Sequence, residues 1–227
     1  LQGLDLEIRR GERIGLIGGT GSGKSTTLDL VMGLLTPTDG RILIDGANLH
    51  DPSHPERLAA WQAAIAHVPQ SIYLTDSSIA ENIAFGLPLE QICLTRVREA
   101  AQQAQIGSFI ESSAHAYDTF VGERGIRLSG GQRQRIGIAR ALYKRAHVLV
   151  FDEATSALDN TTEQAVIEAI EGLSRKLTLV IIAHRLSTVR RCDRVIRMQQ
   201  GCITAEGPPH LVLAKAYADT NAVAKAT

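Results

Sequence analysis

The chain has 227 residues, of which 44% are hydrophobic, enough for one large core or for a core with a smaller lobe. Lys and Arg number 24, as do Asp and Glu, so no strong net charge favours nucleic acid or an anionic membrane surface. The three cysteines, Cys93, Cys192 and Cys202, have no C-x-x-C spacing. This count and spacing argue against a disulfide framework and a zinc site, and indicate buried or inert thiols in a reducing compartment.

The first part of the chain predicts a strand, a loop and a helix. Residues 13–17 form a short apolar run that leads into a Gly-rich turn, and residues 24–35 carry apolar side chains at helical spacing. Residues 37–50 predict a turn and a short strand, and residues 63–70 predict a further strand that Pro69 stops. No apolar run approaches the roughly 20 residues that span a bilayer. The chain opens directly in a strand-like alternation, so we expect residue 1 to be an internal boundary of a longer protein.

The pattern changes at about residue 71. From there to about residue 145 strand signals are few, and apolar residues from Val97 to Ala104 are spaced for one face of a helix. We therefore expect a helical lobe inserted into an α/β core.

Strands return after this lobe. Apolar runs at 147–154, 177–184 and 193–198 predict strands, with a helix over 162–173 and a last helix in the Ala-rich tail. Strands that alternate with helices predict a mostly parallel sheet with helices on both faces, whose ligand site lies at the carboxyl ends of the strands.

A phosphate-binding loop is the first chemical motif. Residues 18–25 match G-x-x-x-x-G-K-[ST] between a predicted strand and a predicted helix, the context that this motif requires. Glycines let the backbone approach the β-phosphate, Lys24 reaches the β- and γ-phosphates, and the Ser25 hydroxyl is placed for Mg²⁺. The pattern arises by chance in about one chain of this length in a hundred, so a Gly-rich turn with a solvated lysine is the weaker interpretation. The predicted loop comprises Gly18, Gly19, Thr20, Gly21, Ser22, Gly23, Lys24, Ser25 and Thr26.

Polar residues end three of the predicted strands. Asp152 would hold Mg²⁺ directly or through water, and Glu153 would orient and partly deprotonate a water aimed at the γ-phosphorus, although such a pair can also cap the next helix. His184 would donate a hydrogen bond to a γ-phosphate oxygen or position that water. Gln70 could supply an amide oxygen to Mg²⁺ or to the water and report γ-phosphate occupancy to the lobe, although loop glutamines are usually just solvated.

The stretch "RLSGGQRQR", residues 127–135, looks like a second anion cradle. Exposed backbone N–H groups and a helix N-terminus both favour negative charge, and we expect the helix to begin near Gln132.

Together these motifs resemble the nucleotide-binding domain of ATP-binding cassette (ABC) transporters, over nearly the whole chain. A five-residue match to LSGGQ arises by chance in only about one such chain in several thousand. The similar motifs, in the family's order, are Walker A (residues 18–26), the Q-loop (Gln70), the signature (128–132), Walker B (148–153), the D-loop (156–159) and the H-loop (His184).

The resemblance implies a single domain with a P-loop NTPase (RecA-like) α/β core over about 1–70 and 146–227, with a mostly parallel sheet. A small antiparallel β portion at the N-terminus and an inserted α-helical subdomain, about 71–145, are implied as well. It further implies an ATPase that uses ATP and Mg²⁺, with Ser25, Gln70 and Asp152 at the metal. Lys24, Gln70, Glu153 and His184 are the implied catalytic residues.

In the family two such domains dimerise head to tail. The signature of one then faces the nucleotide that the Walker A of the other holds. The residues implied to contact the partner's nucleotide are Ser129, Gly130, Gly131, Gln132 and, in the D-loop, Asp159.

Finer features are similar to the exporter side of the family: "PQSIYLTDSSIAENIAFG" (69–86), "VGERG" (121–125), "DEATSALD" (152–159) and "IAHRLSTV" (182–189). The resemblance implies transmembrane domains as partners, fused on the N-terminal side, a place at the cytoplasmic face of a membrane, and no nucleic-acid partner. The alternative is a soluble ABC-type ATPase of DNA repair or translation, which would be expected to show long insertions, a basic face or tandem cassettes. A P-loop kinase would leave the signature and D-loop unexplained.

One feature of the family is missing from this sequence. The aromatic residue that stacks on adenine lies upstream of Walker A in the family, so we expect it before residue 1; the alternative is that adenine is held more loosely here. Trp61, Tyr73 and Phe85 lie in regions that the resemblance places elsewhere.

Overall fold

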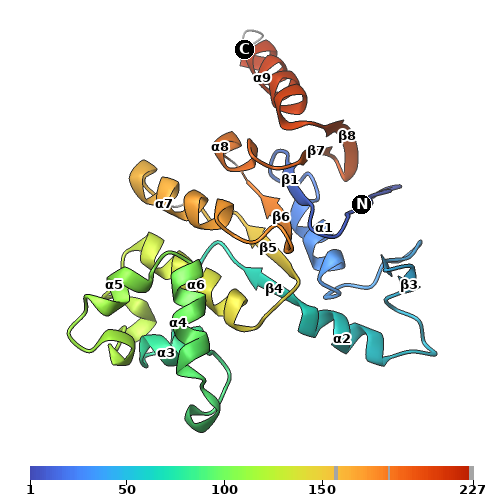
Figure 1. Cartoon of the computed structure of the whole chain (residues 1–227). Helices are drawn as coiled ribbons and strands as arrows, with labels where there is room; N and C mark the ends of the chain where they lie inside the picture. Colours follow the sequence, from blue (N-terminus) through green and yellow to red (C-terminus); the bar gives the residue numbers. More distant parts are fainter. Residues whose placement is uncertain (156–157, 184, 225–227) are drawn as a thin grey trace. The chain divides into compact units, whose positions relative to one another are not determined.

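The structure, a computed structural model, describes residues 1–155, 158–183 and 185–224 (Figure 1). Within these residues the strands form a six-stranded sheet of order β4-β5-β6-β1-β7-β8 and a two-stranded antiparallel sheet of β2 and β3. The strands are β1 (Arg13–Ile17), β2 (Leu43–Ile44), β3 (Ala47–Asn48), β4 (Ile65–Val68), β5 (Val148–Asp152), β6 (Thr178–Ile182), β7 (Arg194–Gln199) and β8 (Cys202–Gly207).

Helices alternate with these strands, which confirms the mixed α/β class. They are α1 (Lys24–Val31), α2 (Glu56–Ala64), α3 (Ile79–Ile83), α4 (Leu94–Gln103), α5 (Gly107–Glu111), α6 (Gly130–Tyr143), α7 (Asn160–Glu171), α8 (Leu186–Val189) and α9 (Pro209–Ala224). Three short 3₁₀ turns, η1 (Leu89–Gln91), η2 (Ala116–Asp118) and η3 (Glu123–Gly125), lie between α3 and α6. Within the described residues no helix is both long and apolar enough to span a bilayer.

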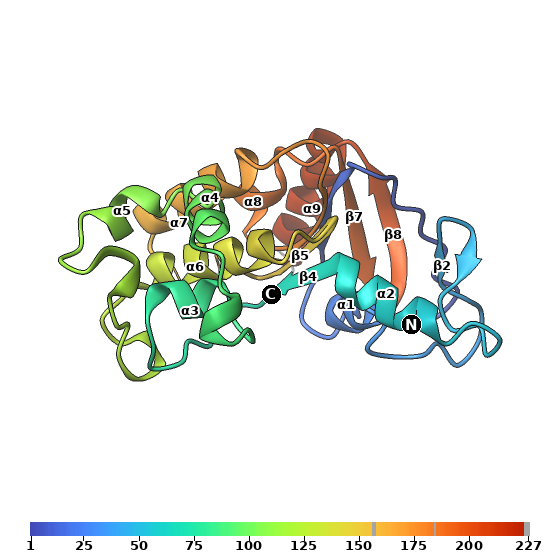
Figure 2. The ribbon, with the colours of Figure 1, turned by 60° about the horizontal axis from the view of Figure 1, so that its bottom comes forward.

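The chain divides into two compact units, Leu1–Ile65 with the chain from Thr178 onward, and Ala66–Leu177. In the first unit β1 lies between β6 and β7 and runs parallel to both. Strand β8 pairs with β7 in the antiparallel direction (Figure 2). All five residues of β1 are buried, as expected for a parallel strand covered on both faces. This strand delivers the chain, at Ile17, to the predicted phosphate loop.

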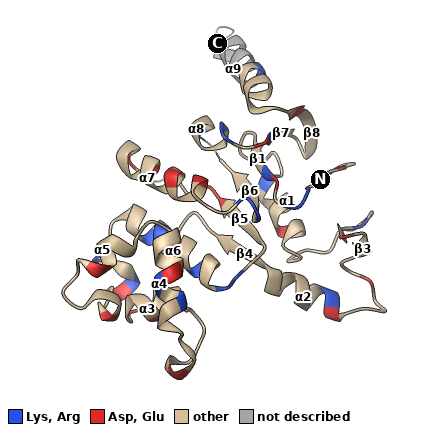
Figure 3. Cartoon of the chain, viewed as in Figure 1, with Lys and Arg blue, Asp and Glu red and all other residues tan. Residues whose placement is uncertain are grey.

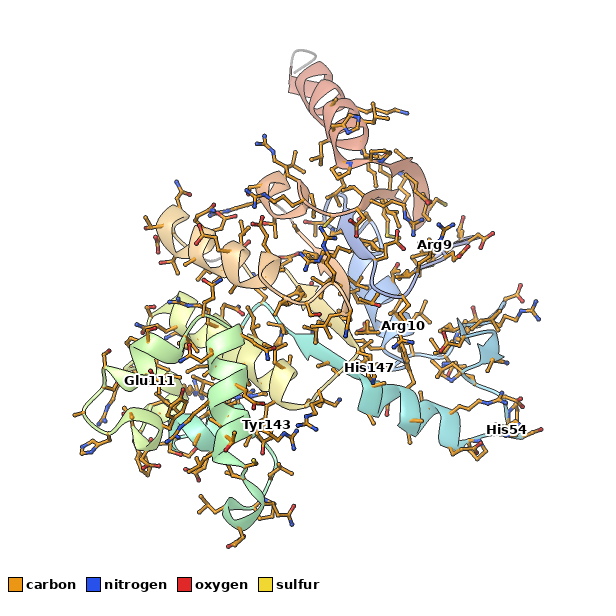
Figure 4. All side chains as sticks on the ribbon, in the orientation of Figure 1. Arg9, Arg10, His54, Glu111, Tyr143 and His147 are labelled. Carbon is orange, nitrogen blue, oxygen red and sulfur yellow. The ribbon has the colours of Figure 1, made fainter. Side chains whose placement is uncertain are left out.

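The second unit is built around α6, which contacts α3, α4 and α7. The predicted helix face is confirmed in α4, where Val97, Ala100 and Ala101 are buried and Ala104 is buried at the C-cap. Tyr143, labelled in Figure 4, ends α6, and the guanidinium of Arg96 lies 4.4 Å from the centroid of its ring. These contacts hold the helical part of the unit together.

Charged residues of both signs are interspersed along each unit (Figure 3). None of the three cysteines is in a disulfide, as expected; Cys192 is buried, Cys202 half-buried and Cys93 exposed. Cys93 is exposed because it is the N-cap of α4, ahead of the buried face of that helix.

Candidate functional site

The phosphate loop joins β1 to α1 in the first unit. Gly18, Gly21 and Gly23 have φ values of 154°, 75° and 101°, a region that L side chains rarely adopt. A Cβ at Gly18 would also lie within 3.0 Å of the carbonyl oxygen of Met198. The path of the loop therefore requires glycine, as the motif predicted.

Lys24 lies inside the curve of this loop. It is only 5% exposed, and its ammonium donates hydrogen bonds to the carbonyl oxygens of Gly18 at 2.9 Å and of Gly19 at 3.0 Å. The Oγ of Ser22 lies 3.4 Å away. The charge is thus held at the centre of the loop, where phosphate oxygens can share its protons.

The outer side of the loop is open. Gly19, Thr20, Gly21, Ser25 and Thr26 are exposed. The N-cap of α1, Gly23, has no side-chain cap, so the first N–H groups of the helix are not blocked by a side chain and favour an anion.

The loop is also anchored from behind. The amide of Gly201, in the turn between β7 and β8, donates to the carbonyl oxygen of Ser22 at 3.0 Å. Thr27 is buried and its hydroxyl donates to the carbonyl oxygen of Gly23 at 2.9 Å. Because the loop is already held at both points, it loses little conformational entropy when a phosphate binds.

Asp152 and Glu153 lie at the carboxyl end of β5 in the second unit, and both are half-buried. Glu153 has φ 51°, a left-handed conformation that costs a non-Gly residue about 1–3 kcal/mol and occurs preferentially at active sites. Ala154 and Thr155, which follow it, are buried and hold this turn. The strain supports a functional carboxylate here over a pair that only caps a helix.

The signature residues form the N-terminus of α6. Ser129 is the N-cap: its Oγ accepts from the amide of Gln132 at 3.2 Å, and Oε1 of Gln132 accepts from the amide of Ser129 at 2.7 Å. This reciprocal pair is a capping box. The prediction that the helix begins near Gln132 was wrong by two residues, because the cap is Ser129 and the helix starts at Gly130.

The two signature glycines allow α6 to approach the start of α7. A Cβ on Gly130 would lie 2.8 Å from Cδ2 of Leu158, and one on Gly131 would lie within 3.0 Å of Cγ2 of Thr162. The structure therefore brings the signature and the end of the predicted D-loop, Leu158 and Asp159, together in one unit. Ser156 and Ala157 of that loop, and His184, lie outside the described residues.

Asp159 is the N-cap of α7. Its Oδ1 accepts from the amides of Thr161 and Thr162, both at 3.1 Å, and from the hydroxyl of Thr161 at 2.6 Å. Hydrogen bonds from Thr161 and then Thr162 hold the pKa of the Asp159 carboxyl well below its usual range. The carboxylate thus has a structural role in the chain itself, and its contact with a nucleotide stays a prediction.

The lowered pKa of Asp159 predicts a pH dependence of stability. The ionised carboxylate stabilises the fold above its unfolded pKa of about 4, and this contribution falls as the pH drops toward the folded value. We expect Asp159→Asn to lower the denaturation midpoint most at neutral pH, with the difference from wild type shrinking below about pH 4. Urea titrations at several pH values measure it, with Asp5→Asn, at an exposed position, as the control. A difference independent of pH would contradict this assignment.

Gln70 follows β4 and Pro69, as predicted. Its carbonyl oxygen accepts from Nε2 of Gln134, a glutamine on α6 that we did not single out from the sequence. Gln134 is one of the buried residues of α6, together with Gly137, Ile138 and Ala141. A polar residue at helical spacing among buried positions was the available signal.

The residues predicted at the metal carry side-chain oxygens, the donors that Mg²⁺ prefers. Ser25 lies exposed in the first turn of α1, and Asp152 ends β5. The described part of the chain contains no cluster of three or more His, Cys, Asp or Glu side chains able to hold a metal by itself. Mg²⁺ commonly takes only one or two protein ligands and completes its shell with phosphates and water.

Two of the three aromatic residues considered for adenine have side-chain partners in the structure. The indole of Trp61 donates to the carbonyl oxygen of Val31 at 2.6 Å, and the guanidinium of Arg140 lies 4.4 Å from the centroid of the Phe85 ring. Tyr73 is 62% exposed. None of the three is assigned to adenine.

Comparisons with known proteins place this geometry in context. A family model described as "ABC transporter" matches residues 1–156. The ATP-dependent lipid A-core flippase of Chromohalobacter salexigens is 44% identical over 220 residues, 96% of this chain and 37% of that protein. The heterocyst differentiation ATP-binding protein HepA of Nostoc sp. is 42% identical over 207 residues, 91% of this chain and 33% of that protein.

A relative from Mus musculus and a solved structure give the same picture. ATP-binding cassette sub-family B member 5 of Mus musculus is 40% identical over 208 residues, 91% of this chain and 16% of that protein. The structure of a bacterial Atm1-family ABC exporter with ATP bound matches with a TM-score of 0.82 and 39% identity, over 95% of this chain and 37% of that one. The chain therefore spans about a third of the length of the bacterial relatives.

Proposed function

Because this chain belongs to the ABC transporter family and is a domain that binds and hydrolyses ATP, we propose that it powers an exporter by ATP-dependent, head-to-tail dimerisation with a second nucleotide-binding domain. The helical subdomain of about residues 71–145 is the part that we propose to be inserted into the α/β core. The proposed partners also include transmembrane domains on the N-terminal side, which would hold the chain at the cytoplasmic face of a membrane.

The observation that carries the proposal is the capped N-terminus of α6. Ser129 is exposed and caps the amide of Gln132, while Gly130 and Gly131 have no side chains that could cover the other N–H groups in the first turn of this 14-residue helix. Such a terminus favours a phosphate group. The chain already has a phosphate loop of its own at Gly18–Thr26, so the second cradle is best explained by a nucleotide that another subunit holds.

Catalysis then follows from the chain's own residues. Lys24 would donate to β- and γ-phosphate oxygens, and Glu153 would take a proton from the water that attacks the γ-phosphorus. Ser25 and Asp152, with the amide oxygen of Gln70, would hold Mg²⁺, which when bound neutralises charge on the phosphate oxygens. His184 would position the water or a γ-phosphate oxygen. Water and ATP give ADP and phosphate, and the dimer opens.

Export, rather than a soluble role, is supported by the relatives. They include an ATP-dependent lipid A-core flippase and an Atm1-family ABC exporter. Opening and closing of the dimer is a two-state change that attached transmembrane domains could use. The balanced charge of the chain argues against a nucleic-acid-binding ATPase.

A complementation experiment tests the shared site. Lys24→Ala removes the ammonium of the phosphate loop, and Ser129→Arg places bulk and charge in the cradle that faces the partner. Each variant alone should hydrolyse ATP at background rate. In an equal mixture half of the dimers pair one variant with the other, and one of their two sites is intact, so about a quarter of the wild-type rate should return.

The readouts are phosphate release and the ATP-dependent mass of the mixture by light scattering. A mixture no more active than the sum of the two variants would exclude the shared-site model.

A further inference from the structure

One side of α6 lies along the segment that comes directly after β4. We call Gln134, Gly137 and Arg140 the contact stripe; three-residue spacing keeps these positions on one side of the helix. Gln134 contacts Pro69 and Gln70, Gly137 contacts Ile72, and Arg140 contacts Tyr73. Six residues of helix rise about 9 Å, and three residues of extended chain cover about 10 Å. The two segments therefore have nearly the same length, so each residue of the contact stripe can meet a successive part of residues 70–73.

Gln134 binds both peptide groups that flank the Cα atom of Gln70. Its Nε2 donates to the carbonyl oxygen of Pro69 at 3.3 Å and to that of Gln70 at 2.6 Å. Each peptide group is planar, so holding the two groups on either side of one Cα fixes φ and ψ of that residue. The direction in which the Gln70 side chain leaves the backbone is thereby set by α6.

The side-chain amide of Gln134 uses its donor but not its acceptor. The side chain is 4% exposed, and its Nε2 donates to two carbonyl oxygens, which only accept and so fix the orientation of the amide. Its own Oε1 is buried and makes no hydrogen bond within the described residues. An unpaired buried acceptor is unfavourable, and an apolar side chain of the same size would avoid it. The two donated hydrogen bonds explain why a glutamine stands here.

The rest of the contact stripe keeps the two segments together. Both terminal nitrogens of Arg140 donate to the carbonyl oxygen of Tyr73 at 3.1 Å, and its Nε donates to that of Asn82 at 2.9 Å. At Gly137 a Cβ would lie within 3.0 Å of Cδ1 of Ile72, so glycine permits the close approach. The segment after β4 is therefore attached to the helix at three successive points.

We propose that Gln134 is a positioning residue that couples Gln70 to the signature. It holds the backbone of Gln70 against the helix that Ser129 caps, so movement of the signature and orientation of the Gln70 amide change together. The coupling passes through five residues of one continuous helix, with no loop between them. This inference rests on the proposed function, in which Gln70 contacts Mg²⁺ or the attacking water.

The test compares Gln134→Met, which keeps the size and removes both donated bonds, with two controls. Gln164→Met changes an exposed glutamine on α7, and Ile138→Val removes one methylene from the buried face of α6 without touching the contact stripe. Amide hydrogen exchange of residues 70–73 is measured without nucleotide, and kcat and KM for ATP are measured with saturating Mg²⁺.

We expect Gln134→Met to speed exchange at residues 70–73 and to lower kcat about tenfold, the usual effect of losing a support of a metal or catalytic group, with little change in KM. Ile138→Val should lower the melting temperature without either effect. Exchange and kcat equal to those of Gln164→Met would overturn the inference. Should the Met variant not fold, Gln134→Leu, also apolar and a good helix former, gives the same comparison.

Gln70→Ala separates this inference from the proposed function. If Gln70→Ala slows hydrolysis while Gln134→Met matches its controls, the coupling is wrong and the proposed role of Gln70 stands. If Gln70→Ala hydrolyses ATP at the wild-type rate, the proposed role of Gln70 fails, and the coupling falls with it.

Discussion

Glu153→Gln is expected to slow ATP hydrolysis by about a hundred- to ten-thousandfold while ATP still binds, the range that loss of a general base produces. The amide has the size of the carboxylate but cannot take the proton of the attacking water. The left-handed backbone at φ 51° is unchanged by the substitution, so the turn after β5 should keep its shape. ATP-bound dimers should then accumulate, because closure no longer ends in hydrolysis.

Phosphate release measures the first effect, and light scattering with ATP measures the second. Glu90→Gln, an exposed change in the 3₁₀ turn η1, serves as the control and should behave as wild type. Wild-type turnover by Glu153→Gln would show that another group is the base. Loss of ATP binding would instead show that the change damages the fold.

Lys24→Ala should weaken ATP binding by about a hundredfold or more. A hydrogen bond to a charged group contributes about 1.5–3 kcal/mol, and two such bonds to phosphate oxygens exceed the roughly 2.8 kcal/mol that separates a hundredfold in affinity. The ammonium is held inside the loop by Gly18 and Gly19, so no other lysine can replace it without rebuilding the loop. Hydrolysis should fall further, since charge grows on the γ-phosphate oxygens as the reaction proceeds.

Equilibrium binding of a fluorescent ATP analogue checks this prediction, with Lys176→Ala, at an exposed position, as the matched control. A melting curve is needed beside it, because the carbonyl oxygens of Gly18 and Gly19 lose a donor in the variant. Binding at wild-type affinity by a folded Lys24→Ala chain would mean that the loop holds phosphate through its backbone alone.

Local patterns predicted the elements that depend on neighbours in sequence. The apolar runs that became β1, β5 and β6 are buried along nearly their whole length, and period and length suffice to recognise such strands. The face of α4 was also recognisable, because Val97 and Ala101 repeat at helical spacing. A capping box at Ser129 and Gln132 could have been read from the spacing of those two residues, which would have placed the start of α6 correctly.

Contacts between distant residues could not be predicted in this way. Gln134 and Gln70 are 64 positions apart, and nothing in either local pattern indicates that one amide holds the backbone of the other. The same is true of the glycines of the signature: their spacing suggests a cradle, whereas their packing against Leu158 and Thr162 follows only from the way α6 meets α7.

The sequence by itself determined the chemistry of this protein, because a phosphate loop, a strand-end carboxylate pair and a signature are short motifs whose function lies in residue type and spacing. It determined the α/β class as well, through the alternation of strands and helices. The tertiary structure decided how those motifs are held: Lys24 turned back onto its own loop, Glu153 in a strained backbone, Asp159 as a helix cap, and Gln70 clamped to the signature helix. The physical reason is that hydrogen bonds and close packing between segments depend on positions in space, which a local pattern of polarity does not contain.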